Sequence, residues 1–459
     1  MSGVFRLRDF RLLVAGEGVS LLGDQFALIA LPWLVLQVTG SALVLGTVLA
    51  IQGIPRALFM LVGGAVTDRF SPRDVMLGAN TARCLAVAAL AVAALSGVVS
   101  VWMLYAYAIA FGLADGFFYP AQNAIVPQIA GGERLERANA VVQGLEQVAL
   151  FVAPVLAGVL IAQLSGGAGG AGDLTGVGAA LAIDAGTFIV SLVTLSLIGV
   201  RRYVSAAPGE ATDGSSNDAR GAATGATPVA ATGADGGGGL LAAIRAGLRY
   251  MWDDQTLRVL FIIIVAVNFL VIGPLLVGIP VIAAQRLSDG TGGSGAESYG
   301  IVMSVFGGAS LLGIALAGLL PRPPARLTGP LLVALCAVFA VAMGLLGYAA
   351  TVFRVAAPVF AMGAASGYLV VFFFSWLQRR TPPEMMGRMM SLILFASVGL
   401  VPVSQALSGA LIKADTTALF VGTAMVLGTL LVAAALSPGL RAMGAEMAGG
   451  PQAGESQHG

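Results

Sequence analysis

The sequence predicts an all-α membrane protein in which twelve transmembrane helices form two pseudo-symmetric six-helix bundles. Three observations lead to this prediction: the composition, the spacing of long apolar stretches, and matching residues at corresponding positions in the two halves of the chain. Of the 459 residues, 58% are hydrophobic and only 10% are charged, and the mean hydropathy is +0.91. A soluble domain carries roughly 25% charged residues, so this composition excludes a water-soluble protein.

Long apolar stretches define the predicted helices. A membrane-spanning helix needs about 20 mostly apolar residues. The first stretch is too long for a signal peptide, so we expect it to be retained. Twelve stretches qualify: 11–37, 43–67, 75–97, 101–125, 141–164, 177–200, 257–284, 299–320, 327–350, 353–376, 389–411 and 416–436.

The chain divides into four predicted regions: an N-terminal bundle (1–200), a cytoplasmic linker (201–256), a C-terminal bundle (257–436) and a cytoplasmic tail (437–459). Within the linker, residues 205–239 are rich in Gly, Ala, Ser and Thr, a composition that predicts flexibility. The stretch LLAAIRAGLRYMWDD that follows has apolar residues on one helical face. It predicts either an amphipathic surface helix or a plain extension of the seventh span.

The positive charges predict the orientation of the chain. If the N-terminus is cytoplasmic, the inner segments hold eighteen Lys or Arg residues and the outer loops hold three. This excess places both termini and the linker in the cytoplasm. The two halves also contain matching residues at corresponding positions, which indicates an internal repeat: Gly64 and Arg69 after the second span correspond to Gly318 and Arg322 after the eighth. Such repeats are typical of secondary transporters, whose halves rock around a central site.

The stretch GGAVTDRFSPR, from Gly63 to Arg73, resembles the loop signature of the major facilitator superfamily. The segments ADGFFYPAQNAIVPQ, IDAGTFIVSL, LLAAIRAGLRYM and RRTPPEMMGRMMSL resemble its third drug:proton antiporter group, which contains macrolide-efflux and enterobactin-exporter proteins. The resemblance covers the chain except the Gly-rich linker and the tail. The helix-five antiporter signature is present only as APVLAG, and the usual Arg near the start of helix four is missing. The resemblance therefore implies the fold more strongly than proton coupling.

The loop motif predicts a cytoplasmic gate. Asp68 follows helix two, where its carboxylate can cap the N-terminus of a neighbouring helix, which the resemblance identifies as helix eleven. Arg69 and Arg73 can pair with acids across the same seam, and Gly64 permits close helix contact. The alternative is that these arginines only anchor the loop in the cytoplasm.

Ionisable residues within the predicted spans are concentrated in the first half. Each costs at least ~2.5–3.5 kcal/mol at the bilayer centre, so each needs a partner or a function. Even if both arginines pair, three acids stay unpaired and are expected to take up protons near neutral pH, as proton coupling requires. The acids are Glu17, Asp24, Asp115, Glu146 and Asp184, and the bases are Arg56 and Arg83.

The depth of these ionisable residues in their spans and their helical spacing rank them as candidates for proton coupling. Asp24 and Arg56 lie near the middle of their spans and could form an ion pair, so Asp24 is either a coupling residue or a structural partner. Glu17 shares its helical face with Asp24 and is also a coupling candidate, and Glu146 either couples or bridges to Arg83. The resemblance makes helices three and six peripheral, which ranks Arg83 and Asp184 lower. Asp115 shares a face with Tyr119 and Gln122 and is a further coupling candidate, although we expect it to join the gate with Arg73.

The second half supplies candidate solute contacts. Tyr368 and Phe372 lie on one face of the tenth span, while Asn268 and Gln405 add isolated polar groups to the seventh and eleventh. Together with Tyr119 and Gln122 they predict an aromatic cavity with few polar anchors, which suits a lipophilic or cationic solute. The alternative is that the aromatic side chains pack against other helices or face lipid.

The predicted function is proton-coupled efflux of small lipophilic or cationic, drug-like compounds by alternating access. The alternative is a dedicated exporter of a siderophore, lysolipid or other metabolite. A membrane enzyme or sensor is disfavoured, because the one histidine is His458 and no nucleophile with its base or metal cluster stands among the spans. We expect no cofactor, metal or nucleic acid. The partners are the lipid bilayer and a small-molecule substrate, and we expect a monomer in the bacterial inner membrane driven by the proton gradient.

Overall fold

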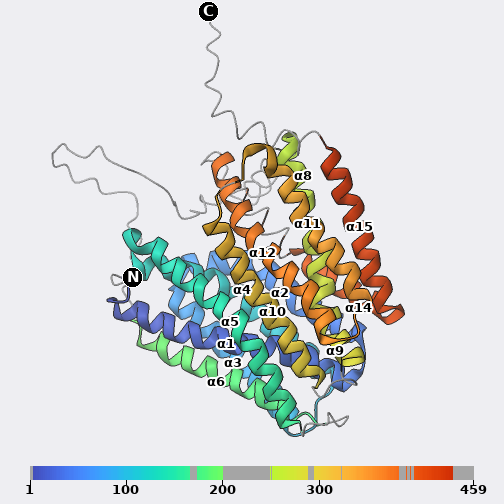
Figure 1. The fold of residues 1–459 in the computed structure, drawn as a ribbon. Coiled ribbons are helices and arrows are strands. Elements are labelled where there is room, and N and C mark those ends of the chain that lie inside the picture. Colours follow the sequence, from blue (N-terminus) through green and yellow to red (C-terminus); the bar gives the residue numbers. More distant parts are fainter. Residues whose placement is uncertain are drawn as a thin grey trace, which may run out of the picture.

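A computed structural model describes residues 4–165, 173–199, 251–287, 294–321, 323–381 and 399–437, with positions 249, 389, 393 and 397. The described residues are helical throughout apart from short turns, as predicted (Figure 1). The N-terminal bundle contains α1 (Arg8–Thr39), α2 (Ala42–Arg69), α3 (Pro72–Leu95), α4 (Val101–Ala130), α5 (Leu135–Leu164) and α6 (Thr175–Leu197). The C-terminal bundle contains α8 (Gln255–Val267), the π-helical turn η2 (Asn268–Ile272), α9 (Gly273–Arg286), α10 (Gly295–Leu319), α11 (Ala325–Gly347), α12 (Val352–Arg380), α14 (Val401–Ala414) and α15 (Thr416–Leu436).

Eleven helical stretches in the described part of the chain are long and apolar enough to cross a membrane, with α8, η2 and α9 forming one of them. The predicted span at 389–411 is represented by α14, which is shorter because most of 382–400 lies outside the described residues. The linker at 205–239, most of LLAAIRAGLRYMWDD and the tail beyond residue 437 also lie outside them. The prediction of an all-helical, multi-span protein is confirmed.

The two bundles meet at one end and diverge at the other (Figure 1). We call the end with loops 39–42 and 414–416 the distal face, and the end with the N-terminus the N-terminal face. At the distal face a β-carbon on Gly46 of α2 would collide with the carbonyl of Gln405, and one on Gly158 of α5 would collide with the carbonyl of Ala296. Near the N-terminal face, Gly64 and Gly318 have no neighbouring atoms within 4 Å of that position.

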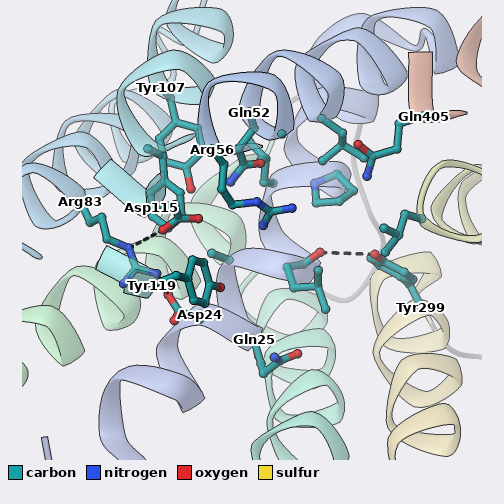
Figure 2. Close-up of a pocket in the computed structure, with 18 residues that line it drawn as sticks. Asp24, Gln25, Gln52, Arg56, Arg83, Tyr107, Asp115, Tyr119, Tyr299 and Gln405 are labelled. Atoms are coloured by element: carbon teal, nitrogen blue, oxygen red, sulfur yellow. Dashed lines mark hydrogen bonds and ion pairs between the residues drawn. The ribbon is translucent and has the colours of Figure 1, made fainter. Parts of the chain in front are cut away.

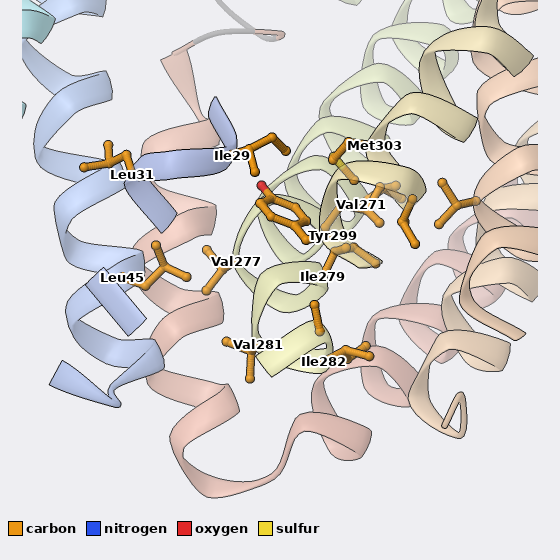
Figure 3. Close-up of a cluster of buried hydrophobic side chains, with 14 of the residues drawn as sticks. Ile29, Leu31, Leu45, Val271, Val277, Ile279, Val281, Ile282, Tyr299 and Met303 are labelled. Atoms are coloured by element: carbon orange, nitrogen blue, oxygen red, sulfur yellow. The ribbon is translucent and has the colours of Figure 1, made fainter. Parts of the chain in front are cut away.

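Apolar side chains fill the distal contact between the bundles. Ile29 and Leu31 of α1 and Leu45 of α2 belong to one buried cluster with Val277 and Val281 of α9 (Figure 3). Such dense packing makes the contact between the bundles specific, because any added volume must displace a neighbour.

Tyr299 of α10 adds a polar contact to this cluster. Its hydroxyl donates to the carbonyl oxygen of Leu28 at 3.3 Å. That carbonyl lacks its usual helical partner, because Pro32 stands four residues later in α1 and has no N–H. Proline in one bundle thus creates the acceptor that a tyrosine of the other bundle uses.

Replacing Gly300 by valine is expected to destabilise the protein by about 1–3 kcal/mol, since it overpacks a tight contact. A β-carbon at Gly300 would collide with the carbonyl of Pro154, so α5 and α10 could no longer approach. The stability is measured as the melting temperature in detergent. Gly422→Val in α15 is the control, because that glycine has open space around it among the described residues. Equal melting temperatures for the two variants would contradict the role of the distal contact.

Candidate functional site

A cavity of about 230 Å³ lies between the bundles, close to the middle of the helices (Figure 2). The N-terminal bundle supplies most of its polar lining, from α1, α2, α3 and α4. The C-terminal bundle adds Leu276, Tyr299 and Gln405. The polar residues of the N-terminal bundle that line it are Asp24, Gln25, Gln52, Arg56, Arg83, Tyr107, Asp115 and Tyr119.

Arg83 of α3 is the centre of the charged cluster. Its Nη2 lies 3.0 Å from Oδ1 of Asp24, and its Nε lies 3.0 Å from Oδ1 of Asp115. The side chains of Arg83 and Asp115 are 2% and 3% exposed, whereas that of Asp24 is 23% exposed. Asp24 is therefore the member of the ion-pair cluster that is most accessible from the cavity.

Three phenyl rings enclose the Arg83 guanidinium. The rings of Phe111, Phe118 and Phe188 have their centroids 4.6–4.9 Å from its carbon Cζ. A guanidinium over an aromatic face is attracted by the ring quadrupole, and here the rings also keep water away. The two ion pairs therefore operate in an environment with little screening.

The predicted ion pair between Asp24 and Arg56 is wrong. Asp24 pairs with Arg83 and not with Arg56, and no carboxylate of the described residues lies within 4.0 Å of the Arg56 guanidinium. Arg56 lines the cavity instead. Arg83 was expected at the periphery because it stands on helix three, yet the inner face of α3 points into the bundle at the level of both aspartates.

The expected Arg73–Asp115 pair is also absent. Arg73 donates to the carbonyl oxygens of Leu195 and Ser196 at 2.8 and 2.5 Å. It thus caps the end of α6, where free carbonyls and the helix dipole favour a cation. Asp115 lies halfway along α4, several turns from the membrane face where Arg73 lies. At that depth its partner is Arg83.

Two further acids of the N-terminal bundle are buried without an arginine in direct contact. Glu17 is 4% exposed and accepts hydrogen bonds from Gln122 at 2.9 Å and from Ser191 at 3.5 Å. Asp184 is fully buried, and within the described residues its Oδ2 has no hydrogen-bond partner. Around Arg83 the bundle therefore holds more carboxylates than direct cationic partners, as the sequence predicted.

Glu146 lies apart from this cluster. It is half-buried on α5, does not line the cavity and forms no ion pair with a described residue. The expected bridge to Arg83 is not formed, because Arg83 already contacts two aspartates. Its proton-coupling role stays a prediction.

Of the predicted solute contacts, Tyr119 and Gln405 line the cavity. The other four lie elsewhere. Gln122 donates to Glu17, Asn268 donates to the carbonyl of Ile264 in its own helix, and Tyr368 and Phe372 stack on each other with ring centroids 6.2 Å apart.

The described residues include only one side of the predicted gate. Asp68 and Arg69 are exposed, and neither forms an ion pair with a described residue. The start of helix eleven, their expected partner, lies outside the described residues. Among the described residues, no atom of a neighbouring element lies within 4 Å of the β-carbon position of Gly64. The gate stays a prediction.

Sequence reasoning missed Asn80 and Ser191. Asn80 donates to Ser191 at 3.0 Å and accepts from Arg83 at 3.3 Å, and both are fully buried. Helical spacing could have found them, since Asn80 precedes Arg83 by one turn and Ser191 follows Asp184 by two turns on the same face.

Comparisons with known proteins agree with this architecture. The Major Facilitator Superfamily matches residues 13–403. The chain is 25% identical to macrolide efflux protein A of Streptococcus pyogenes over 191 residues, which is 42% of this chain and 44% of that protein. It is 29% identical to multidrug efflux pump Tap of Mycolicibacterium fortuitum over 260 residues, or 55% and 53% of the two chains. The matches thus span about half of the length of these curated relatives.

Two solved structures show the same fold over nearly the whole chain. The nucleoside transporter NupG matches with a TM-score of 0.67 and 12% identity, covering 95% of this chain and 98% of that one. A bacterial homologue of the iron transporter ferroportin, in an inward-facing state, matches with a TM-score of 0.63 and 14% identity, covering 94% and 99%. Since the superfamily match covers most of the chain, this protein belongs to the Major Facilitator Superfamily and is a secondary transporter, not an enzyme.

Proposed function

We propose that the protein exports small lipophilic or cationic compounds in exchange for protons. One observation carries this proposal: Asp24 and Asp115, which both line the cavity, share the single guanidinium of Arg83. With the buried Glu17 and Asp184, the described part of this region holds four carboxylates and two arginines, Arg83 and Arg56, so a proton or a cationic solute can complete the balance. The relatives named as macrolide and multidrug efflux proteins support a drug-like solute.

The exchange follows from competition for Asp24. When Asp24 is ionised it can attract a cationic solute into the cavity, where Tyr119 offers an aromatic face. When Asp24 takes up a proton, that attraction is lost and Arg83 keeps Asp115 as its partner. Because the two protonation states favour different occupants, they can bias the rocking of the bundles in opposite directions.

The positive-inside bias supports a topology with both termini and the N-terminal face in the cytoplasm. In that topology the tight distal contact between the described parts of the two bundles faces the outside. We place the protein as a monomer in the bacterial cell membrane, which is consistent with its bacterial relatives.

Vesicles with an acidic interior test the proposal. Those that contain the protein in the inside-out orientation are expected to accumulate ethidium, and a protonophore should abolish the accumulation. Empty vesicles with the same gradient are the control. Ethidium uptake that is equal with and without the gradient would rule out proton coupling.

A further inference from the structure

Two buried side chains, Asn80 and Ser191, connect Arg83 to Glu17, and neither of them lines the cavity. Arg83 donates to Oδ1 of Asn80 at 3.3 Å, and the Nδ2 of Asn80 donates to the hydroxyl of Ser191 at 3.0 Å. That hydroxyl in turn donates to Oε1 of Glu17 at 3.5 Å. Each member is at most 4% exposed. The chain therefore runs through the interior of the N-terminal bundle, from α3 to α6 and on to α1.

Every hydrogen bond in this chain points the same way. The cation is the first donor, and the carboxylate is the last acceptor. Such an alignment polarises each bond in the same sense and favours an ionised Glu17. Gln122 of α4 supplies a second donor at 2.9 Å to the other oxygen of Glu17.

The position of Glu17 separates it from the solute. It stands two turns before Asp24 on α1, or about 10 Å along the helix axis toward the N-terminal face. Unlike Asp24, it does not line the cavity. A solute in the cavity can therefore contact Asp24 but not Glu17.

The charged groups that act on Glu17 are few. Arg83 of α3 and Asp24 of its own helix interact with it electrostatically, while α4 and α6 present the neutral Gln122 and Ser191. On α5 the residue packed against the adjacent Gly18 is Leu145, which Glu146 follows in sequence.

From this geometry we propose that Glu17 is a second coupling carboxylate. Its protonation depends on the charge balance at Arg83, to which Asn80 and Ser191 connect it by hydrogen bonds, and the solute does not contact it. When Asp24 binds a proton, Arg83 loses one counter-charge and the ionised Glu17 supplies it through the chain. Asn80 and Ser191 are positioning residues in this scheme. The inference rests on the proposed proton-coupled function.

Two substitutions should shift the pH dependence of ethidium transport toward acid. Glu17→Gln keeps the shape but removes a negative charge near Arg83, so half-maximal transport should move toward acid. Ser191→Ala removes a donor to Glu17 and so favours its neutral form, which weakens the same negative charge and should move the profile in the same direction. Each shift is expected to be about half a pH unit or more.

The controls separate structural from coupling effects. Ser20→Ala removes a buried hydroxyl from α1 that has no hydrogen-bond partner in the described part of the chain, and its profile should match the unaltered protein. Asn80→Ala breaks the chain one link earlier and should shift in the same direction as Ser191→Ala, which keeps the test valid if the latter fails to fold.

The outcomes are distinct. Acid shifts in Glu17→Gln and in either chain variant support the inference, and an alkaline shift in either chain variant contradicts it. Lower rates with unchanged pH profiles in Glu17→Gln and either chain variant would overturn it and leave proton coupling intact. If the unaltered protein transports ethidium independently of pH and gradient, the proposed function fails, and the inference fails with it.

Discussion

Replacing Arg83 with alanine is expected to destabilise the N-terminal bundle by about 3–5 kcal/mol, since the change leaves buried carboxylates without their cation. Asp115 is 3% exposed and has Arg83 as its ion-pair partner. The three phenyl rings around the guanidinium would also enclose an empty space. The variant should unfold at a clearly lower temperature in detergent and show no transport.

Arg56→Ala is the matched control, because Arg56 is also a membrane-embedded arginine at the cavity but lies further than 4.0 Å from every described carboxylate. Its loss of stability should be much smaller. Combining Arg83→Met with Asp24→Asn and Asp115→Asn should recover part of the lost stability, because it removes the unpaired charges. An Arg83→Ala protein as stable as the Arg56→Ala protein would contradict the central role of Arg83.

Asp24→Asn is expected to abolish gradient-driven ethidium transport while leaving exchange of ethidium across the membrane without a gradient. Asparagine keeps the shape and can still accept a hydrogen bond from Arg83, but it cannot bind and release a proton. Loss of a coupling proton should reduce the gradient-driven rate at least about 100-fold. The rate is measured in the same vesicles with and without a pH gradient.

Glu146→Gln tests the competing assignment. Glu146 lies outside the cavity and has no ion pair within the described residues, so its loss should cost far less than the loss of Asp24. Collapse in Glu146→Gln alone would move the coupling role to α5. Undiminished gradient-driven transport in both variants would remove both assignments.

The fold could be predicted because each span can be recognised from its own residues alone, as a stretch of apolar residues of membrane length. The excess of acids in the first half could be predicted for the same reason, since it needs only a count of residues within spans. Eleven helical stretches of sufficient length and the buried acids around Arg83 agree with those predictions.

The partners of the charges could not be predicted, because pairing depends on how each helix is rotated about its axis. Asp24 and Arg56 have similar depths, yet rotation turns Asp24 toward α3 and its Arg83. Helical spacing places Asn80 on the face of Arg83 and Ser191 on that of Asp184, but their contact with each other arises only where α3 meets α6. The aromatic pair Tyr368 and Phe372 shows the reverse case, since their shared face lies outside the cavity.

Simultaneous recording of ethidium and protons tests most directly whether the shared guanidinium couples the two. Vesicles that contain the protein and a trapped pH-sensitive dye are loaded with ethidium in the absence of any other gradient. The account predicts that ethidium leaving in one direction drives protons in the other, and that Asp24→Asn moves ethidium with no accompanying proton signal. Ethidium movement without proton movement in the unaltered protein would contradict the account.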